Sequence, residues 1–252
     1  MTPDSLRAVA DQLLQARRDG RQIPVPADAA PADMAEAYAI QDAVVAESGT
    51  IGGWKVGAAG PRAEPRCAPI PSSLILQGPA RLPASRFHHL GVEAEIAFRI
   101  GADLPAKGSP YTKKELNAAI AAVMPAIELV ESRWTGWPRT AKLWQLADSQ
   151  SNGALIVGPS RTDWHDIDLA IQPVALTAND RVLAEAIGGN IAGDLIRLVT
   201  WLANHAARRC GGLKAGDIVT TGSCTGMSFV TAGSTVRATF PGLGEAELTL
   251  DP

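Results

Sequence analysis

Gly-Val-Glu-Ala-Glu-Ile-Ala-Phe-Arg-Ile, residues 91–100, alternates apolar and polar side chains in the manner of a half-buried β-strand. Because side chains on a strand repeat every two residues, Glu93 and Glu95 are expected on the same face. Two carboxylates a few ångströms apart repel each other strongly unless a proton or a cation lies between them. The stretch therefore predicts a strand that carries a charged site.

A third acid, Glu128, lies further along the chain among apolar neighbours. A carboxylate between Ile127 and Leu129 is seldom buried without a partner. Three carboxylates without Cys or His suit a hard divalent cation, so Glu93, Glu95 and Glu128 predict a site for Mg²⁺ or Mn²⁺. The alternative for the Glu-x-Glu pair alone is the solvent-facing side of an antiparallel strand.

Composition narrows the class of protein. The chain has 252 residues, of which 46% are hydrophobic, and a formal net charge of −3. No basic run appears, which argues against nucleic acid as a partner. Three scattered cysteines, Cys67, Cys210 and Cys224, favour free thiols in a reducing compartment. The longest apolar run, residues 118–127, is too short for a bilayer and no signal peptide is evident, so we expect a cytoplasmic protein without a membrane partner.

Helical periodicity and β-like runs divide the chain unevenly. Helices are predicted at 4–19, 33–47, 112–122 and 190–209, and strands at 53–57, 73–77, 92–100, 153–158, 170–178, 216–222 and 235–250. Strand runs with few helices and no regular βαβ alternation predict an α+β fold, a mixed β-roll, rather than a doubly wound sheet. We expect a helical N-terminal arm, residues 1–50, on a β-rich catalytic core, residues 51–252, as one structural unit.

Lys55 lies within Gly-Trp-Lys-Val-Gly, residues 53–57. A lysine in such an apolar strand is either a surface residue of an edge strand or a functional cation. Near metal-bound oxyanions, a desolvated lysine is a good anchor or proton donor. The flanking glycines would let the backbone approach a ligand closely.

Two polar segments and a histidine pair leave alternatives open. Residues 146–153 favour a turn, and residues 216–222 form a strand whose end could offer hydroxyl and N–H groups to a carboxylate. His88 and His89 precede the strand of Glu93 and are either a ligand or base, or part of a surface loop.

Taken together, these segments resemble the fumarylacetoacetate hydrolase superfamily, and within it the 2-keto-4-pentenoate hydratase / 4-oxalocrotonate decarboxylase branch. The segments that carry the resemblance are residues 36–41, 53–57, 93–95, 125–128 with 132–133, 148–153 and 216–222. The resemblance implies a mixed β-roll of the fumarylacetoacetate hydrolase C-terminal-domain type with N-terminal helices. It also implies a homo-oligomer.

The resemblance implies roles for eight residues. The metal ligands for Mg²⁺ or Mn²⁺ would be Glu93, Glu95 and Glu128, the catalytic residues Lys55, Asp148 and Ser151, and the substrate contacts Lys55, Ser151, Thr221 and Gly222. Two departures bear on the substrate. Residues 65–71 are shorter than the corresponding family loop and lack its acid, and Ser149 stands where the family usually has Asn.

The function expected from these features is a divalent-metal-dependent hydratase, a lyase, that acts on a 2-oxo or 2-hydroxy-dienoic acid such as 2-hydroxypenta-2,4-dienoate in aromatic catabolism. Three alternatives stand beside it. They are a 2-oxo acid decarboxylase, an acylpyruvate-type C–C hydrolase with His88 or His89 as base, and a homologue that binds a keto acid without turnover. A complex with another enzyme of the pathway is a further expectation.

Overall fold

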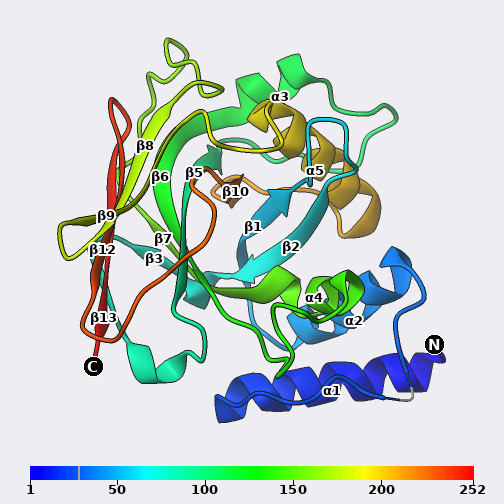
Figure 1. Cartoon of the computed structure of the whole chain (residues 1–252). Coiled ribbons are helices and arrows are strands. Elements are labelled where there is room, and N and C mark those ends of the chain that lie inside the picture. Colours follow the sequence, from blue (N-terminus) through cyan, green and yellow to red (C-terminus); the bar gives the residue numbers. More distant parts are fainter. Residues whose placement is uncertain (28) are drawn as a thin grey trace.

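The computed structural model describes residues 1–27 and 29–252 and contains two β-sheets with helices around them (Figure 1). The eight-stranded sheet consists of β1 (Ile51–Gly57), β2 (Arg66–Pro71), β3 (Ile75–Gln77), β5 (Gly91–Ile100), β6 (Ile120–Val130), β7 (Asn152–Val157), β10 (Ile218–Ser223) and β11 (Ser228–Phe229). Its strand order is β2-β1-β10-β5-β6-β7-β3, with β11 paired to β5. The mixture of parallel and antiparallel pairs confirms the predicted mixed α+β fold.

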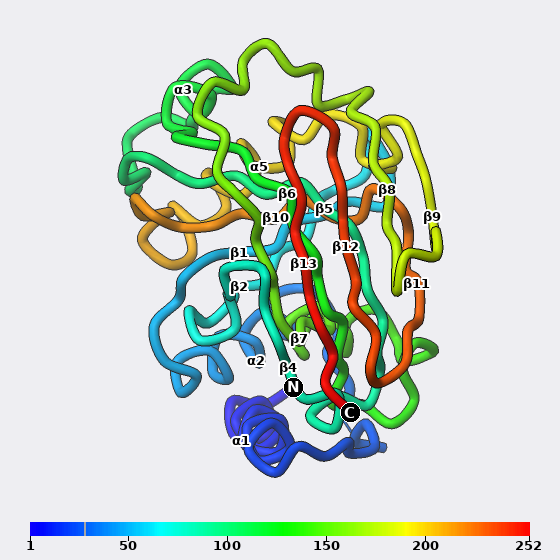
Figure 2. Tube along the Cα trace, turned by 90° about the vertical axis from the view of Figure 1, so that its left-hand side faces the viewer, coloured from blue at the N-terminus to red at the C-terminus, as the bar shows by residue number. Residues whose placement is uncertain are grey.

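The second sheet is smaller and lies against the first. Its five strands, β4 (Ala80–Pro83), β8 (Pro173–Ala178), β9 (Arg181–Ile187), β12 (Thr235–Phe240) and β13 (Gly244–Asp251), are ordered β4-β13-β12-β8-β9. Figure 2 views the molecule from the side of this sheet, with β12 and β13 in front of β5 and β6. The second sheet thus covers one face of β5 and β6, and most side chains of these central strands are buried.

The helices gather at two ends of the sheets (Figure 1). They are α1 (Pro3–Asp19), α2 (Met34–Ala46), α3 (Lys113–Ala119), α4 (Lys142–Ala147) and α5 (Leu195–Arg209), with short 3₁₀ turns η1 (Ser72–Leu74), η2 (Ala84–Arg86) and η3 (Ser149–Ser151). α1 packs on α2, α2 packs on α4, and α3 packs on α5. None of the helices in the described part of the chain has the length and apolar character needed to cross a bilayer.

Local signals explain where the first two helices begin and end. Thr2 caps α1 by accepting a hydrogen bond from the backbone of Ser5, and Gly20 ends it in the left-handed conformation at φ 59°. Asp33 caps α2 in the same way as Thr2 caps α1. Both helices lie close to their predicted positions.

The predicted helix over 112–122 is too long. Thr112 and Glu115 form a capping box that starts α3, but the helix ends at Ala119. The chain then enters β6, which pairs with β5 from Ile120 onward. β6 lies between β5 and β7, and β12 and β13 of the second sheet pack on it. Nearly all of its side chains are buried, so its sequence is a continuous apolar run without the alternation that identified β5.

Other predicted helices and strands also have different boundaries in the structure. The helix predicted over 190–209 begins only at Leu195, where the side chain of Asp194 caps it. The strand predicted over 235–250 is a hairpin of β12 and β13. β2 pairs with β1, so the connection between these two strands covers only residues 58–65.

Candidate active site

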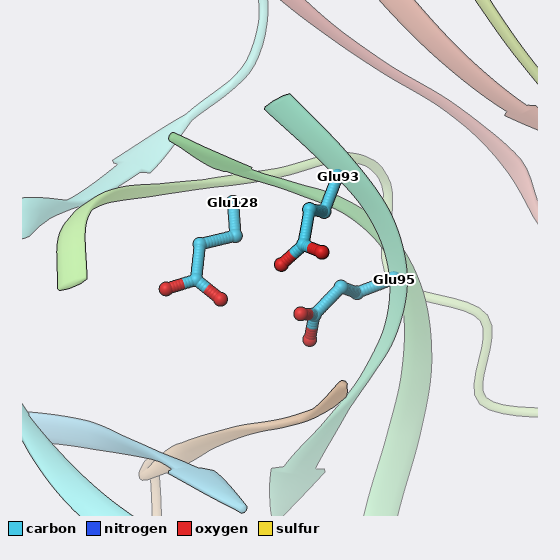
Figure 3. Close-up of side chains that lie close together, drawn as sticks. All are labelled: Glu93, Glu95 and Glu128. Carbon is cyan, nitrogen blue, oxygen red and sulfur yellow. The ribbon is translucent and has the colours of Figure 1, made fainter. Parts of the chain in front are cut away.

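The side chains of Glu93, Glu95 and Glu128 converge from β5 and β6, as Figure 3 shows. One carboxylate oxygen of each lies within 4.8 Å of the others. The antiparallel register pairs Glu93 directly with Glu128, and the two-residue repeat puts Glu95 beside them. Glu95 and Glu128 are each 1% exposed, so the cluster lies inside the molecule.

Burial and mutual repulsion set the charge state of this cluster. Burial, followed by the charge of Glu128, raises the pKa of Glu93 to about 7 and that of Glu95 to about 8. Charged carboxylates at this spacing need a counter-charge. A set of three carboxylate oxygens fits a hard divalent cation, which supplies it.

Lys55 supplies one positive charge next to the cluster. Its Nζ donates to a carboxylate oxygen of Glu128 and, at 3.0 Å, to the carbonyl oxygen of Gln150. Burial lowers the pKa of Lys55, but the charges of Glu128 and Glu95 outweigh it, so the pKa is raised overall. Lys55 is therefore protonated at neutral pH and acts as a cation or proton donor rather than as a base.

The end of β10 holds Glu95 in place. β10 runs parallel to β1 and pairs Thr220 with Lys55, which places Thr220 beside the cluster. The hydroxyl of Thr220 and, at 2.9 Å, the backbone N–H of Gly222 both donate to Glu95. The hydroxyl of Thr221 instead donates to the carbonyl oxygen of Ile96 at 2.7 Å. In this structure Thr221 and Gly222, which were expected to contact substrate, bind strand β5 and its carboxylate.

Asp148 is fully buried beneath the site. Its carboxylate accepts hydrogen bonds from the Ser132 hydroxyl at 3.1 Å, from the backbone N–H of Arg133 at 2.8 Å and from the Arg133 guanidinium. Arg17 adds a further ion pair at 3.5 Å. With its oxygens occupied in this way, Asp148 holds Ser132 and Arg133 in position, and the catalytic role expected for it stays a prediction.

The segment that follows Asp148 has an unusual backbone. Ser149, Gln150 and Ser151 have φ values of 51°, 51° and 60°, a region that non-glycine residues rarely adopt. Ser151 is buried, and its backbone bonds to Asp148 and Glu131. This conformation directs the carbonyl oxygen of Gln150 to Lys55.

Three contacts in the site were not predicted, and they involve Thr220, Gln150 and Asn152. Nδ2 of Asn152 lies 3.4 Å from Glu128, at the start of strand β7. Asn152 is 1% exposed, and a buried amide at the start of an apolar strand is a signal that sequence reasoning could have used. The contact of Thr220 with Glu95 follows from the two-residue repeat of its strand only when the pairing of that strand is known.

A cavity of about 570 Å³ opens beside Lys55. Gln150, Arg66 and Lys142 also line it, together with Glu64. Glu64 accepts a hydrogen bond from the Trp201 indole at 2.7 Å. Three cations face one acid, so this cavity suits an anionic substrate.

His88 and His89 lie away from the cavity beside Lys55. Nδ1 of His88 lies 2.9 Å from a carboxylate oxygen of Glu131, and His88 lines a different cavity. The ring of His89 packs against Trp137 with centroids 4.4 Å apart. Within the described part of the chain no histidine lines the cavity beside Lys55, so the hydrolase hypothesis lacks its base there.

Comparison with known proteins shows the family of the chain. The model of the family described as fumarylacetoacetate (FAA) hydrolase C-terminal matches residues 43–251. A 2-keto-4-pentenoate hydratase from Burkholderia vietnamiensis is 30% identical over 98% of this chain and 97% of its own length. A 2-hydroxyhexa-2,4-dienoate hydratase from Comamonas testosteroni is 29% identical over 62% of this chain and 58% of its own.

Among solved structures, 4-oxalocrotonate decarboxylase from Pseudomonas putida G7, complexed with magnesium and adipate, has the same fold. Its TM-score is 0.87 at 24% identity, and the match covers 99% of this chain and 98% of the decarboxylase. The resemblance inferred from the sequence is thus confirmed by the family match, the hydratase relative and the shared fold. The chain belongs to the fumarylacetoacetate hydrolase family.

Proposed function

We propose that this protein is a divalent-metal-dependent hydratase that acts on a 2-hydroxy-dienoic acid or its 2-oxo form, such as 2-hydroxypenta-2,4-dienoate, in aromatic catabolism. The observation that carries the proposal is the convergence of three buried carboxylates and a protonated lysine beside a cavity lined by cations. The hydratase relatives, which align over nearly the whole chain, support the same reaction class.

The three glutamates would hold Mg²⁺ or Mn²⁺. When bound, such an ion supplies Lewis-acid stabilisation of negative charge that develops on substrate oxygens. The rest of the site prepares Glu95 and Glu128 for this task. Thr220 and Gly222 donate to Glu95 and Asn152 donates to Glu128, which favours the charged carboxylates.

Lys55 would bind the substrate and move a proton. Its Nζ is held between Glu128 and the carbonyl oxygen of Gln150, within the wall of the cavity. There it would pair with the substrate carboxylate, or deliver a proton to the terminal carbon while the 2-hydroxyl group of the dienol releases its own, which gives an α,β-unsaturated ketone. Addition of one water, with its hydroxyl on C4 of this ketone, then gives 4-hydroxy-2-oxopentanoate. One dienoate and one water thus account for all atoms of the product.

The test is the ultraviolet absorbance of 2-hydroxypenta-2,4-dienoate, followed with Mg²⁺, with Mn²⁺ and with EDTA. We expect metal-dependent loss of the dienoate and formation of 4-hydroxy-2-oxopentanoate. Glu95→Gln should abolish this loss, whereas Glu185→Gln, an exposed change on β9, should not alter it. Undiminished turnover in EDTA would contradict the metal role of the glutamates.

A second candidate, decarboxylation of a 2-oxo dicarboxylic acid, is favoured by one observation. Arg66 and Lys142 line the same cavity as Lys55, and either could bind a second carboxylate. Release of carbon dioxide from 4-oxalocrotonate, reduced in Arg66→Gln, would support this candidate. If the dicarboxylate is not consumed while the dienoate is hydrated, the decarboxylase candidate is wrong.

The state of assembly and the location of the protein stay predictions. We propose a cytoplasmic homo-oligomer, in line with the family resemblance, which could also bind another enzyme of its pathway. Size-exclusion chromatography with light scattering measures the oligomer directly, and a monomer at micromolar concentration would contradict it.

A further inference from the structure

We propose that a second cavity, formed where the end of α1 meets η2 and the start of β7, binds a small oxyanion, a carboxylate or a phosphate, and thereby sets the position of the 149–152 segment. The binding site is independent of the proposed hydratase function. Only the consequence for catalysis, through Gln150 and Asn152, rests on that function.

The lining of this cavity is strongly basic. Its volume is about 270 Å³, enough for a small anion with bridging water. Five arginines line it, namely Arg17, Arg18, Arg21, Arg86 and Arg133. The only acids in the lining are Glu47 and Glu131, among the residues that the structure describes.

Both of these acids already have other partners. Glu131 accepts hydrogen bonds from the ring and the backbone of His88, at 2.9 and 2.8 Å. Glu47 lies 3.7 Å from Arg7 on α1. Over residues 1–27 and 29–252, the exposed Arg18 and Arg86 make no ion pair, so both guanidinium groups can receive a ligand.

At the buried end of the cavity two guanidinium groups lie against one aspartate. Arg17 and Arg133 share the single carboxylate of Asp148. Burial, followed by the charge of Arg133, lowers the pKa of Arg17 to about 9, although Asp148 opposes this. Nε of Arg17 is buried and makes no hydrogen bond within the described residues. An oxyanion would give Arg17 Nε, Arg18 and Arg86 a partner, and guanidinium groups bind carboxylate and phosphate oxygens well.

The same arginines hold the segment that reaches the glutamate cluster. Arg17 donates to the Ser149 hydroxyl at 3.1 Å, and the next residue, Gln150, accepts from Lys55. Arg133 donates to the carbonyl oxygen of Asn152 at 2.9 Å, while Nδ2 of Asn152 contacts Glu128. An anion that attracts the two guanidinium groups therefore acts on both ends of a segment whose backbone is already strained.

Binding is tested by titrating the full-length protein with inorganic phosphate and, separately, with succinate, at constant ionic strength set with chloride. The readouts are calorimetry and the melting temperature. We expect saturable binding of at least one probe, and whichever binds identifies phosphate or carboxylate as the source. Arg86→Gln and Arg18→Gln should weaken binding about tenfold, the effect of losing one charge-assisted hydrogen bond.

Two matched variants locate the anion. Arg181→Gln removes an exposed arginine on β9 and should leave binding unchanged. Arg66→Gln removes a cation from the cavity beside Lys55 and should also leave it unchanged. If Arg66→Gln weakens binding and Arg86→Gln does not, the anion lies in the substrate cavity and the proposal is wrong. An effect no larger than that of chloride also overturns it.

The consequence for the segment is tested by hydrogen exchange of peptides that cover residues 146–154. Saturation with the bound probe should slow exchange there in the wild type and not in Arg86→Gln. Unchanged exchange despite binding would overturn the coupling to the glutamate cluster. Because neither readout uses turnover, an inactive enzyme that binds the anion would count against the proposed hydratase function and not against this site.

Discussion

Two buried clusters of charge contact the 148–152 segment. They differ in the sign of their charge and in the secondary structure that carries their side chains. Glu93, Glu95 and Glu128 outnumber the one lysine beside them and are attached to the paired strands β5 and β6. Arg17 and Arg133 outnumber Asp148 and lie at the end of a helix and in loops. A strand ladder fixes its side chains by register, whereas irregular backbone depends on the charges themselves. The comparison suggests that each cluster is completed by a ligand of opposite charge.

The largest effect is expected from removing a charge of the acidic cluster. Glu95→Gln replaces a carboxylate by an amide while Thr220 and Gly222 can still hold the side chain. We expect metal affinity to fall by about a hundredfold or more, which exceeds the loss seen when a residue behind a ligand is changed. Calorimetry with Mn²⁺ measures it, with Glu185→Gln as the control. Equal affinity in the two variants would show that the metal is held elsewhere.

Lys55→Met should separate metal binding from chemistry. The change removes the proton donor and the partner of Glu128 but none of the three carboxylates. Turnover should fall by about 10²- to 10⁴-fold, the range for loss of a general acid, while Mn²⁺ still binds. Steady-state kinetics and calorimetry on one preparation give both numbers. Retained turnover would reduce Lys55 to a structural partner of Glu128.

The basic cluster should reveal itself in stability. Asp148→Asn leaves the Arg17 and Arg133 guanidinium groups without their carboxylate in a buried position. We expect the free energy of unfolding to fall by about 3 kcal/mol or more, because removing the carboxylate leaves buried guanidinium charges without a partner. Urea denaturation measures it. Asp166→Asn, which breaks an exposed pair with Arg161, should cost less than about 1 kcal/mol. Recovery of stability with phosphate or succinate would tie this cluster to its anion.

The same contrast explains how far the sequence could predict the molecule. The pair Glu93 and Glu95 was predictable because strand periodicity is local, and Glu128 because a carboxylate among apolar residues demands a partner. Strand β6 was missed as such, since a strand buried on both faces shows no alternation.

The network of Asp148 could not be predicted from local pattern. Its partners Arg17 and Arg133 come from a distant helix and a loop, and the left-handed backbone of residues 149–151 has no glycine to signal it. A Ser- and Asn-rich segment is typical of any turn, so its sequence favoured a turn. The family resemblance assigned catalytic roles to Asp148 and Ser151 of this segment, and those roles stay predictions.

The smallest expected effect is a pH dependence that belongs to the acidic cluster alone. Without metal, the folded protein keeps protons on Glu93 and Glu95 up to pKa values of about 7 and 8, whereas the unfolded chain releases them near 4.5. The folded state then binds more protons, so stability falls as pH rises between these values. A bound cation displaces the protons and removes this loss. The difference in melting temperature between Mg²⁺ and EDTA should therefore grow from pH 5 to pH 8. In Glu95→Gln it should grow less, and a difference that stays constant from pH 5 to pH 8 would show that the carboxylates are already charged without metal.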